Sequence, residues 1–293
     1  MKKFLSVLAA AAAILTATGC STGTSSGTGS TSDNASVSDT ESTSSDASSD
    51  SASSGEDSTS DETGGFKVEK LRVGSDVAYP PFEYFDTDGT TPIGVDMELA
   101  QAIGDKLGCE IEIVNTAWDG IFAGLSKGDY DVVISAVTIT PDRLLDFDFS
   151  DPYIENWQSI VVMADGSVKP ASPAELDGLK VGYQEDTTSD IYLTDFIAKN
   201  GINVETFEYA TVMNAYDDLA AGRLDAVISD STVAAKYIAD SKYEQSWIQT
   251  EGEPELFGVC MPKNSTELQK AVNDALAEIK ADGTLDKIFN TYF

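Results

Sequence analysis

Apolar positions beyond residue 66 fall into two alternating patterns. Strands are expected over 71–74, 131–136 and 225–229, and a short uninterrupted apolar run such as Val132-Val133-Ile134 is typical of a strand buried on both faces of a parallel sheet. Residues 95–107 and 189–199 carry apolar side chains at helical spacing, and a glycine follows each segment or lies two positions beyond it. Further strands are expected over 109–114, 159–163, 179–183, 204–209 and 256–261, further helices after Asp119, from Thr140-Pro141 and over 213–221, 231–239 and 265–281, and a loop over 144–154. The alternation predicts an α/β fold.

One segment occurs twice. Residues 128–135 read GDYDVVIS and residues 222–229 read GRLDAVIS. Each copy has a helix-terminating glycine, an aspartate, an apolar run and a serine, which predicts two similar α/β lobes. Because ligands of open α/β sheets bind outside the carboxyl ends of the strands, two such lobes would share a ligand cleft between them.

The chain is expected to cross between the lobes twice. Pro170, Pro173 and Gly178 mark a boundary loop, and Gly252-Glu253-Pro254 marks the return. We therefore predict that lobe 1 comprises residues 66–157 and 253–293, that lobe 2 comprises residues 158–252, and that the two crossings form a two-segment hinge.

The N-terminal 65 residues differ in composition from the rest. Lys2-Lys3 precedes an apolar stretch from Phe4 to Ala17, which is shorter than the about 20 residues that span a membrane and predicts a signal peptide over 1–19. Cys20 after Gly19 resembles a bacterial lipobox, in which the signal is cut before a cysteine that then carries lipid. The alternative is an ordinary secretory peptide with a chance cysteine.

Residues 20–65 are expected to form a disordered tether behind the lipidated Cys20. Residues 21–65 are mostly serine, threonine and glycine, with nine acidic residues and no lysine or arginine. Such a segment cannot bury enough apolar surface to offset its ordering entropy. The alternative is a disordered tail without function.

Charge and composition exclude several classes of function. The formal net charge is −32, which argues against a nucleic-acid surface. The chain has no histidine, so histidine-based triads and imidazole metal ligands are excluded, and neither a metal nor a cofactor is expected. Cys109 opens a strand with an edge-like pattern and Cys260 lies in a central run, so two separate thiols are expected, although a disulfide stays possible outside the cytoplasm.

Two charged residues follow the two copies of the repeat. Thr140-Pro141 predicts a helix start whose free N–H groups, with Arg143 on the first turn, would bind a carboxylate. The alternative is a capped helix with a surface arginine. Asp230 ends the second repeat strand and suits an ammonium group, or alternatively caps the helix that follows. Together they predict a site for a zwitterion.

Three further residues lie at strand-to-helix connections. Asp76 and Tyr79 follow the first strand, and Trp118 precedes a predicted helix. A ring face and a carboxylate there could contact a ligand side chain, while the alternative is that both aromatic residues belong to the core.

Several motifs together resemble the extracellular solute-binding proteins of amino-acid ABC importers, the polar amino-acid family. The motifs are Tyr79-Pro80-Pro81-Phe82-Glu83, residues 94–100 (GVDMELA), residues 138–143 (TITPDR), residues 148–153 (DFSDPY) and Asp282-Gly283-Thr284-Leu285. The resemblance covers residues 66–293. It implies a type II periplasmic-binding-protein fold that closes on one L-amino acid.

The resemblance also implies roles for individual residues. By position, Arg143 and Thr138 would bind the α-carboxylate of the ligand, and Asp230 and the Ala136 carbonyl would bind its α-ammonium group. The side-chain end would be formed by flanking rings, lobe 2 threonines and polar groups at the tip: Tyr79, Trp118, Thr187, Thr188, Asp76, Gln184 and Glu185. The family usually has a glycine before the Thr-Thr pair, where this chain has Asp186.

These observations favour a binding protein that captures a free polar or cationic L-amino acid outside the cell. It would act as a monomer held to the membrane through Cys20 and deliver its ligand to a permease. The chain has no glycine-rich phosphate loop, so the permease and the ATPase would be separate chains. The alternatives are a ligand-sensing module and a dehydratase-type enzyme that uses Glu185 as general acid. The favoured function has no catalytic residues.

Overall fold

The computed structural model describes residues 67–293. The predicted signal peptide over 1–19, the lipidation site Cys20 and the tether to residue 65 lie outside the described residues. Within the described part, no helix combines the length and the apolar character that crossing a membrane requires.

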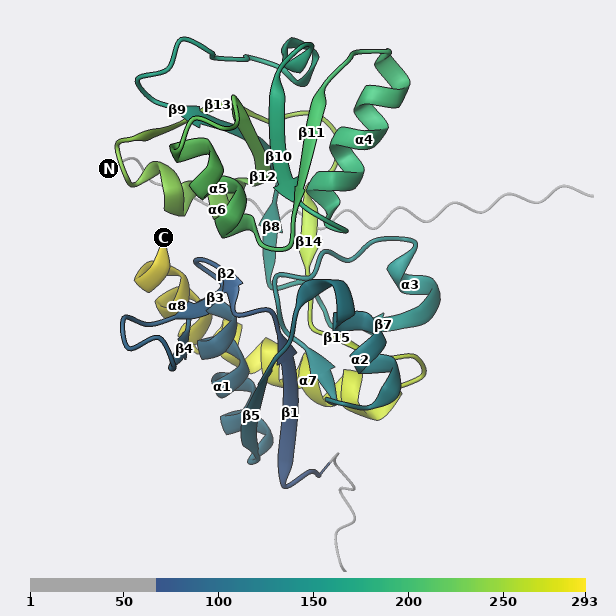
Figure 1. Ribbon diagram of the computed structural model, residues 1–293. Coiled ribbons are helices and arrows are strands. Elements are labelled where there is room, and N and C mark those ends of the chain that lie inside the picture. The colour runs from purple at the N-terminus through teal and green to yellow at the C-terminus, as the bar shows by residue number, and fades with distance from the viewer. Residues whose placement is uncertain (1–66) are drawn as a thin grey trace, which may run out of the picture. The chain divides into compact units, whose positions relative to one another are not determined.

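Two five-stranded sheets of the same design organise the described residues (Figure 1). The first has the order β5 (Glu110–Asn115), β1 (Lys70–Ser75), β6 (Val132–Val133), β15 (Cys260–Pro262) and β7 (Phe147–Phe149). The second has the order β11 (Glu205–Tyr209), β10 (Lys180–Gln184), β12 (Ala226–Asp230), β9 (Gln158–Met163) and β13 (Tyr243–Ile248). In each sheet the first three strands are parallel and the fourth joins them antiparallel. The repeated segments therefore place β6 and β12 at equivalent positions.

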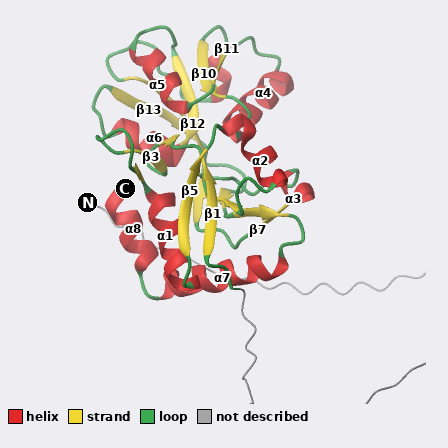
Figure 2. Ribbon diagram, turned by 60° about the horizontal axis from the view of Figure 1, so that its bottom comes forward, coloured by secondary structure: helices red, strands yellow, loops and turns green. Residues whose placement is uncertain are grey.

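Helices lie on both sides of the strands (Figure 2). The first sheet carries α1 (Val95–Leu107), α2 (Ile121–Lys127), α7 (Thr266–Ala281) and α8 (Thr284–Tyr292), and the second carries α4 (Thr188–Asn200), α5 (Val212–Ala220) and α6 (Ser231–Ile238). Short elements complete the fold: β2 (Ala78–Tyr79), β3 (Glu83–Phe85), β4 (Pro92–Ile93), α3 (Arg143–Asp146) and 3-10 turns at Trp118–Gly120 and Pro173–Leu176. The two lobes confirm the predicted fold class.

Two glycines fix the ends of α1. Gly94 has a φ of 131°, and a Cβ there would overlap the carbonyl oxygen of Phe82. This close approach lets the Asp96 amide donate to that carbonyl (2.9 Å), so the start of α1 is bound to the segment before β3. Gly108 ends the helix in the left-handed conformation, as its place in the sequence predicts.

The hinge is a two-stranded ribbon between the lobes. β8 (Ile154–Asn156) pairs antiparallel with β14 (Glu255–Phe257), and Figure 1 shows both running from one sheet toward the other. β14 directly follows the predicted return at Gly252-Glu253-Pro254, and β8 ends just before the predicted boundary at 157/158. The prediction that Pro170, Pro173 and Gly178 mark the boundary loop is wrong, because these residues lie between β9 and β10, two strands of the second sheet. The lobe boundaries at 157/158 and 252/253 stay a prediction.

Several expected elements differ from the structure. The segment 144–154, expected as a loop, contains β7 and the start of β8, and the helix expected from Thr140-Pro141 begins at Arg143 and has four residues. The strand expected over 256–261 is two strands, because the chain leaves the hinge at β14 and joins the first sheet at β15. β13 and α8 were not expected.

Both cysteines of the described part are free thiols, as predicted. Cys109 precedes β5, which is an edge strand, and Cys260 is buried in β15 between two neighbouring strands. Their positions in the sheet explain why the two thiols do not meet.

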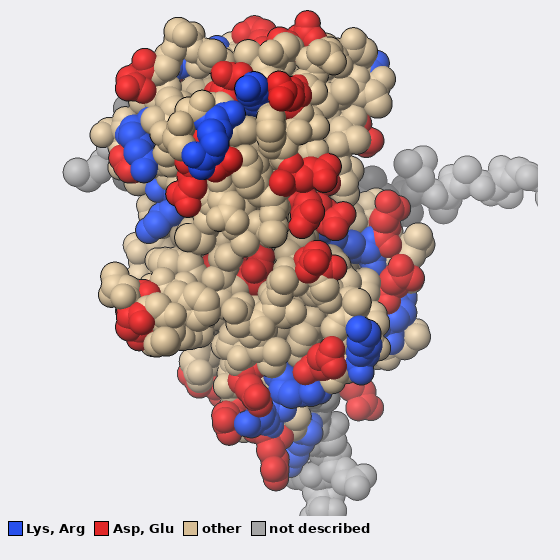
Figure 3. Space-filling view, viewed as in Figure 1, with Lys and Arg blue, Asp and Glu red and all other residues tan. Residues whose placement is uncertain are grey.

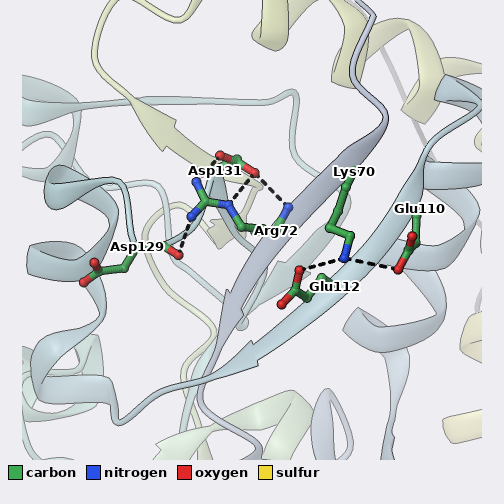
Figure 4. Close-up of polar contacts among 6 residues, drawn as sticks. All are labelled: Lys70, Arg72, Glu110, Glu112, Asp129 and Asp131. Atoms are coloured by element: carbon green, nitrogen blue, oxygen red, sulfur yellow. Dashed lines mark hydrogen bonds and ion pairs between the residues drawn. The ribbon is translucent and has the colours of Figure 1, made fainter.

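Ion pairs tie together the strand ends of the first sheet that point away from the hinge (Figure 4). Arg72 binds Asp131 through two nitrogens, Nη2 at 2.6 Å and Nε at 3.2 Å, and Lys70 lies 3.4 Å from Glu110 and 3.1 Å from Glu112. Because these groups are partly exposed, solvent screens the pairs and each contributes little to stability. They link β1 to β5 and to Asp131, the residue before β6.

Candidate ligand-binding site

A cavity lies where the strand ends of the two sheets face each other. Its lining includes ten of the eleven predicted ligand-binding residues: Asp76, Tyr79, Trp118, Ala136, Thr138, Arg143, Gln184, Thr187, Thr188 and Asp230. The sequence analysis missed two further lining residues, Glu83 and Ser135.

Arg143 contributes a guanidinium group from lobe 1. Its Nη1 donates to the Thr138 carbonyl (2.8 Å), and its central carbon lies 5.4 Å from the ring centre of Trp118 and 5.0 Å from that of Phe122. Burial lowers its pKa. Among the described residues no carboxylate forms an ion pair with it, so most of its N–H donors stay available to an anion. The expected anion site at a helix start is not formed, since the Arg143 amide donates to Thr140 Oγ1 (3.2 Å) and the helix is one turn long.

Asp230 contributes a carboxylate from lobe 2, at the end of β12. It is 3% exposed and accepts from Tyr79 Oη (2.5 Å), Asn156 Nδ2 (2.7 Å) and Gln158 Nε2 (3.0 Å). Burial, and after it the negative charge of Glu255, raise its pKa to about 7. Its side chain makes no capping hydrogen bond to α6, so the alternative role as a helix cap is wrong.

Glu255, at the start of β14, is a hinge residue that the sequence analysis missed. Its carboxylate accepts from Thr138 Oγ1 of lobe 1 (3.3 Å) and from Thr188 Oγ1 of lobe 2 (3.1 Å). The side-chain amides of Asn156 (3.0 Å) and Gln158 (2.9 Å) also donate to it. The hinge thus holds a negative charge directly behind the cavity.

The far end of the cavity presents hydrogen-bond acceptors. Gln184 Nε2 donates to Asp76 Oδ2 (3.1 Å) and to the Ala210 carbonyl (3.2 Å), and both partners are acceptors, which fixes the amide orientation. Gln184 is 3% exposed, and its Oε1 has no partner among the described residues. Burial raises the pKa of Asp76 to about 6. This end of the cavity therefore suits a ligand group that carries N–H donors.

Trp118 and Asp186 join the two lobes beside the cavity. Trp118 Nε1 donates to the Asp186 carbonyl (3.1 Å). Asp186 has a φ of 58°, so the aspartate adopts the left-handed conformation for which glycine is better suited. The departure from the family pattern at this position leaves the backbone geometry of a glycine in place.

The remaining predicted residues have different surroundings. Thr187 is the N-cap of α4: its Oγ1 accepts from the Asp190 amide (3.4 Å) and donates to the Gln184 carbonyl (2.7 Å). Its hydroxyl is thus already hydrogen-bonded within lobe 2. Glu185 does not line the cavity, and its amide donates to Tyr209 of β11 (3.0 Å).

Acidic side chains gather on the face shown in Figure 3, at the level where the two lobes meet. The cavity lining has the same bias, with the carboxyl groups of Asp76, Glu83 and Asp230 and the single guanidinium of Arg143. Such a field attracts positively charged solutes.

A cavity between two similar α/β lobes, joined by two hinge strands, defines a two-lobed solute-binding protein of the type II periplasmic class. Residues 71–293 match the bacterial extracellular solute-binding proteins, family 3, and the chain belongs to this family.

Known relatives agree with this assignment. The chain is 33% identical over 237 residues to ABC transporter arginine-binding protein 1 of Escherichia coli (strain K12), covering 78% of this chain and 93% of that protein. An ancestral arginine-binding protein bound to arginine is 36% identical, with a TM-score of 0.71 over 78% of this chain and 100% of that one. An ancestral amino acid-binding protein described as a precursor of cyclohexadienyl dehydratase is also 36% identical, with a TM-score of 0.69 over 77% of this chain and 95% of that one.

Proposed function

We propose that this protein binds one free polar L-amino acid outside the cytoplasm, with a cationic side chain favoured, and delivers it to the permease of an ABC importer. The observation that carries this proposal is the pair Arg143 and Asp230, which line one cavity from opposite lobes. A free amino acid is the small solute with a carboxylate and an ammonium group on one carbon atom. A ligand that contacts both lobes stabilises their closed arrangement.

The charges of the lining support the preference for a cationic side chain. In the proposed complex Arg143 pairs with the α-carboxylate and Asp230 with the α-ammonium group, so their charges are matched by the backbone of the ligand. Asp76 and the Gln184 Oε1 acceptor are left for the side chain. A guanidinium or ammonium group would supply both the charge and the N–H donors that these two residues lack.

Calorimetry with a panel of L-amino acids tests the proposal. Arginine or lysine is expected to bind most tightly, glutamine and histidine more weakly, and glutamate and alanine least. The proposal fails if no amino acid binds more tightly than millimolar. The side-chain preference alone fails if glutamate or alanine binds best.

Membrane attachment through Cys20 is the second part of the proposal. The sequence pattern at Gly19-Cys20 supports lipidation, which would keep the binding lobes near the permease at the end of a long tether. Labelled palmitate is expected to be incorporated into the full chain and not into Cys20→Ser. The variant should then be released into the medium or the soluble envelope fraction.

A sensing role and an enzymatic role were the alternatives. Glu185, the candidate general acid, does not line the cavity, which weighs against the enzyme, although one similar protein is described as a precursor of a dehydratase. We infer that the ligand is released unchanged, and mass spectrometry of the bound amino acid after prolonged incubation tests this. Loss of uptake on deletion of a neighbouring permease gene would favour transport over sensing.

A further inference from the structure

Two buried carboxyl groups lie together at the wall of the cavity, and neither has a cationic partner among the described residues. Glu83 and Asp96 are both 0% exposed. They come from separate segments, which the hydrogen bond from the Asp96 amide to the Phe82 carbonyl brings side by side. Two adjacent buried carboxylates without a cation would repel each other strongly.

Each carboxyl group has one oxygen with partners and one without. Glu83 Oε1 accepts from Ser135 Oγ (2.9 Å), while Asp96 Oδ2 accepts from the Ala136 amide (2.7 Å) and from Tyr153 Oη (3.0 Å). Glu83 Oε2 and Asp96 Oδ1 have no donor among the described residues. The two groups are neighbours, because they accept from the consecutive residues Ser135 and Ala136. A single proton between them would give both free oxygens a partner.

We propose that Glu83 and Asp96 share one proton, Glu83 as the acid and Asp96 as the carboxylate, and that this pair positions Ser135 and Ala136 in the wall of the cavity. Asp96 accepts two strong donors and Glu83 accepts one, so the charge is better stabilised on Asp96. Burial and the neighbouring Asp96 charge raise the pKa of Glu83 well above its usual range, in agreement with this assignment.

The pair connects several lining residues of lobe 1. Ala136 has a φ of 47°, an unfavourable conformation for alanine, and its amide is held by Asp96. Ser135 Oγ, held by Glu83, accepts from the Asp76 amide (3.0 Å). Glu83 and Asp96 are thus positioning residues that act through their neighbours.

The titratable groups around the pair add no positive charge. Asp76 and Tyr79 face Glu83 from the segment after β1, and Tyr153 faces Asp96 from the segment before β8. Loss of the shared proton would place two negative charges against each other, so the proton should persist at neutral pH. The pKa of Glu83 is higher in the folded protein than in the unfolded chain. The contribution of Glu83 to the free energy of unfolding is therefore complete below its pKa in the unfolded chain. It declines as the pH rises toward the pKa of Glu83 in the folded protein.

Infrared spectroscopy of the ligand-free full chain tests the shared proton directly. The wild type is expected to show the C=O band of a protonated carboxyl group at about pH 8.5, where Asp76 and Asp230, whose pKa values are raised to about 6 and about 7, are ionised. This band should be absent from Glu83→Gln, whose amide can donate to Asp96 as the acid does. In Asp96→Asn the band should be lost at a lower pH than in the wild type, because the negative charge of Asp96 is removed while the burial of Glu83 remains. The exposed Glu267→Gln should retain the band.

Two further measurements separate a shared proton from a purely structural role. The ratio of the unfolding constants of wild type and Glu83→Gln should rise with pH, by up to about tenfold per unit above the pKa of glutamate in the unfolded chain. Glu83→Gln should bind its amino acid at least about fivefold more tightly than Glu83→Ala, because only the glutamine can still hold Ser135 and donate to Asp96. A band that persists in Glu83→Gln, or a ratio independent of pH, overturns the proposal. The binding readout rests on the proposed function, but the spectrum and the unfolding ratio do not.

Discussion

At the scale of single residues, the site combines charges that the surrounding fold leaves partly unmatched. Arg143 is held by a carbonyl oxygen and two aromatic rings, so its position is fixed without a neutralising carboxylate from the described residues. Asp230 has three neutral hydrogen-bond donors but no cation, and burial raises its pKa to about 7. A zwitterion would neutralise both groups at once, which neither an anion nor a cation alone could do.

Asp186 gives the first prediction at this scale. Its φ of 58° is costly for an aspartate, and its side chain is exposed. Asp186→Gly should therefore raise the free energy of unfolding by about 0.5 kcal/mol, because the relieved strain exceeds the extra entropy of glycine in the unfolded chain. Urea denaturation measures the change.

The neighbouring residue supplies the control for Asp186→Gly. Glu185 does not have a positive φ, so a glycine there relieves no strain and only adds entropy to the unfolded chain. Glu185→Gly should therefore lower the free energy of unfolding by about 0.5 kcal/mol. If both glycine variants are destabilised alike, the backbone at Asp186 is not strained.

At the scale of elements, hinge strand β14 carries the charge that sets the pH response of the site. Glu255 raises the pKa of Asp230, and Asp230 must be ionised to bind an ammonium group. Ligand affinity should therefore fall below about pH 7, by up to about tenfold per unit. In Glu255→Gln the midpoint of this fall should move to lower pH, because one source of repulsion is removed. Calorimetry from about pH 5 to about pH 8 measures it.

The exposed Glu253, two residues before Glu255, is the matched control. Glu253→Gln should leave the midpoint unchanged, since a solvent-exposed charge is screened. An equal midpoint in wild type and Glu255→Gln would contradict the assigned coupling between β14 and Asp230. A uniform change of affinity at every pH would not, because the Thr138 and Thr188 contacts of Glu255 are also altered.

The elements that the sequence predicted share local signals. Helix α1 ends at its glycine, and β6 and β12 lie at the repeated segments, because glycine caps and uninterrupted apolar runs act within a few residues. β13 was missed because it is an antiparallel edge strand with an irregularity between Gln245 and Trp247. β7 was missed because its partner, β15, is more than a hundred residues away in the chain.

The site could be predicted to a similar extent and for similar reasons. Ten lining residues follow strand ends or family motifs, which are visible in the sequence. Glu83 and Glu255 were missed because their surroundings depend on contacts between distant segments, namely the packing of Phe82 against α1 and the meeting of both lobes at the hinge. For Glu83, the one sequence feature that could have indicated a site residue is that an acidic side chain follows the apolar residues of its motif.

At the scale of the whole molecule, side chains of the two lobes meet directly across the cavity. Tyr79 donates to Asp230, Gln184 to Asp76, and Trp118 to the Asp186 carbonyl. These bonds exist only while the lobes are in contact. Ligand affinity thus includes the energy of lobe-to-lobe contacts that the ligand does not touch.

Trp118→Phe tests this contribution. The phenyl ring can still pack beside the ligand, but the bond to Asp186 is lost, which is worth about 1 kcal/mol. Affinity should fall by about fivefold for every amino acid that binds, without a change in their order. Trp247→Phe, at a tryptophan that stacks on Tyr192 within lobe 2, should leave affinity unchanged. A change in the order of ligands would mean that Trp118 reads the side chain instead.

Ligand-induced stabilisation separates the two poles of the proposed site. An amino acid at about one hundred times its dissociation constant should stabilise the folded wild type by about 2.7 kcal/mol, because it binds only when both lobes are folded. In Arg143→Ala no amino acid should raise the unfolding temperature, since the α-carboxylate is common to all of them.

In Asp76→Asn only ligands with cationic side chains should lose their effect, while glutamine keeps it. If Asp76→Asn leaves the ranking of ligands unchanged, the side chain does not point toward Gln184. If Arg143→Ala still responds to ligand, the carboxylate is bound elsewhere, and the two lobes do not hold the two ends of a zwitterion.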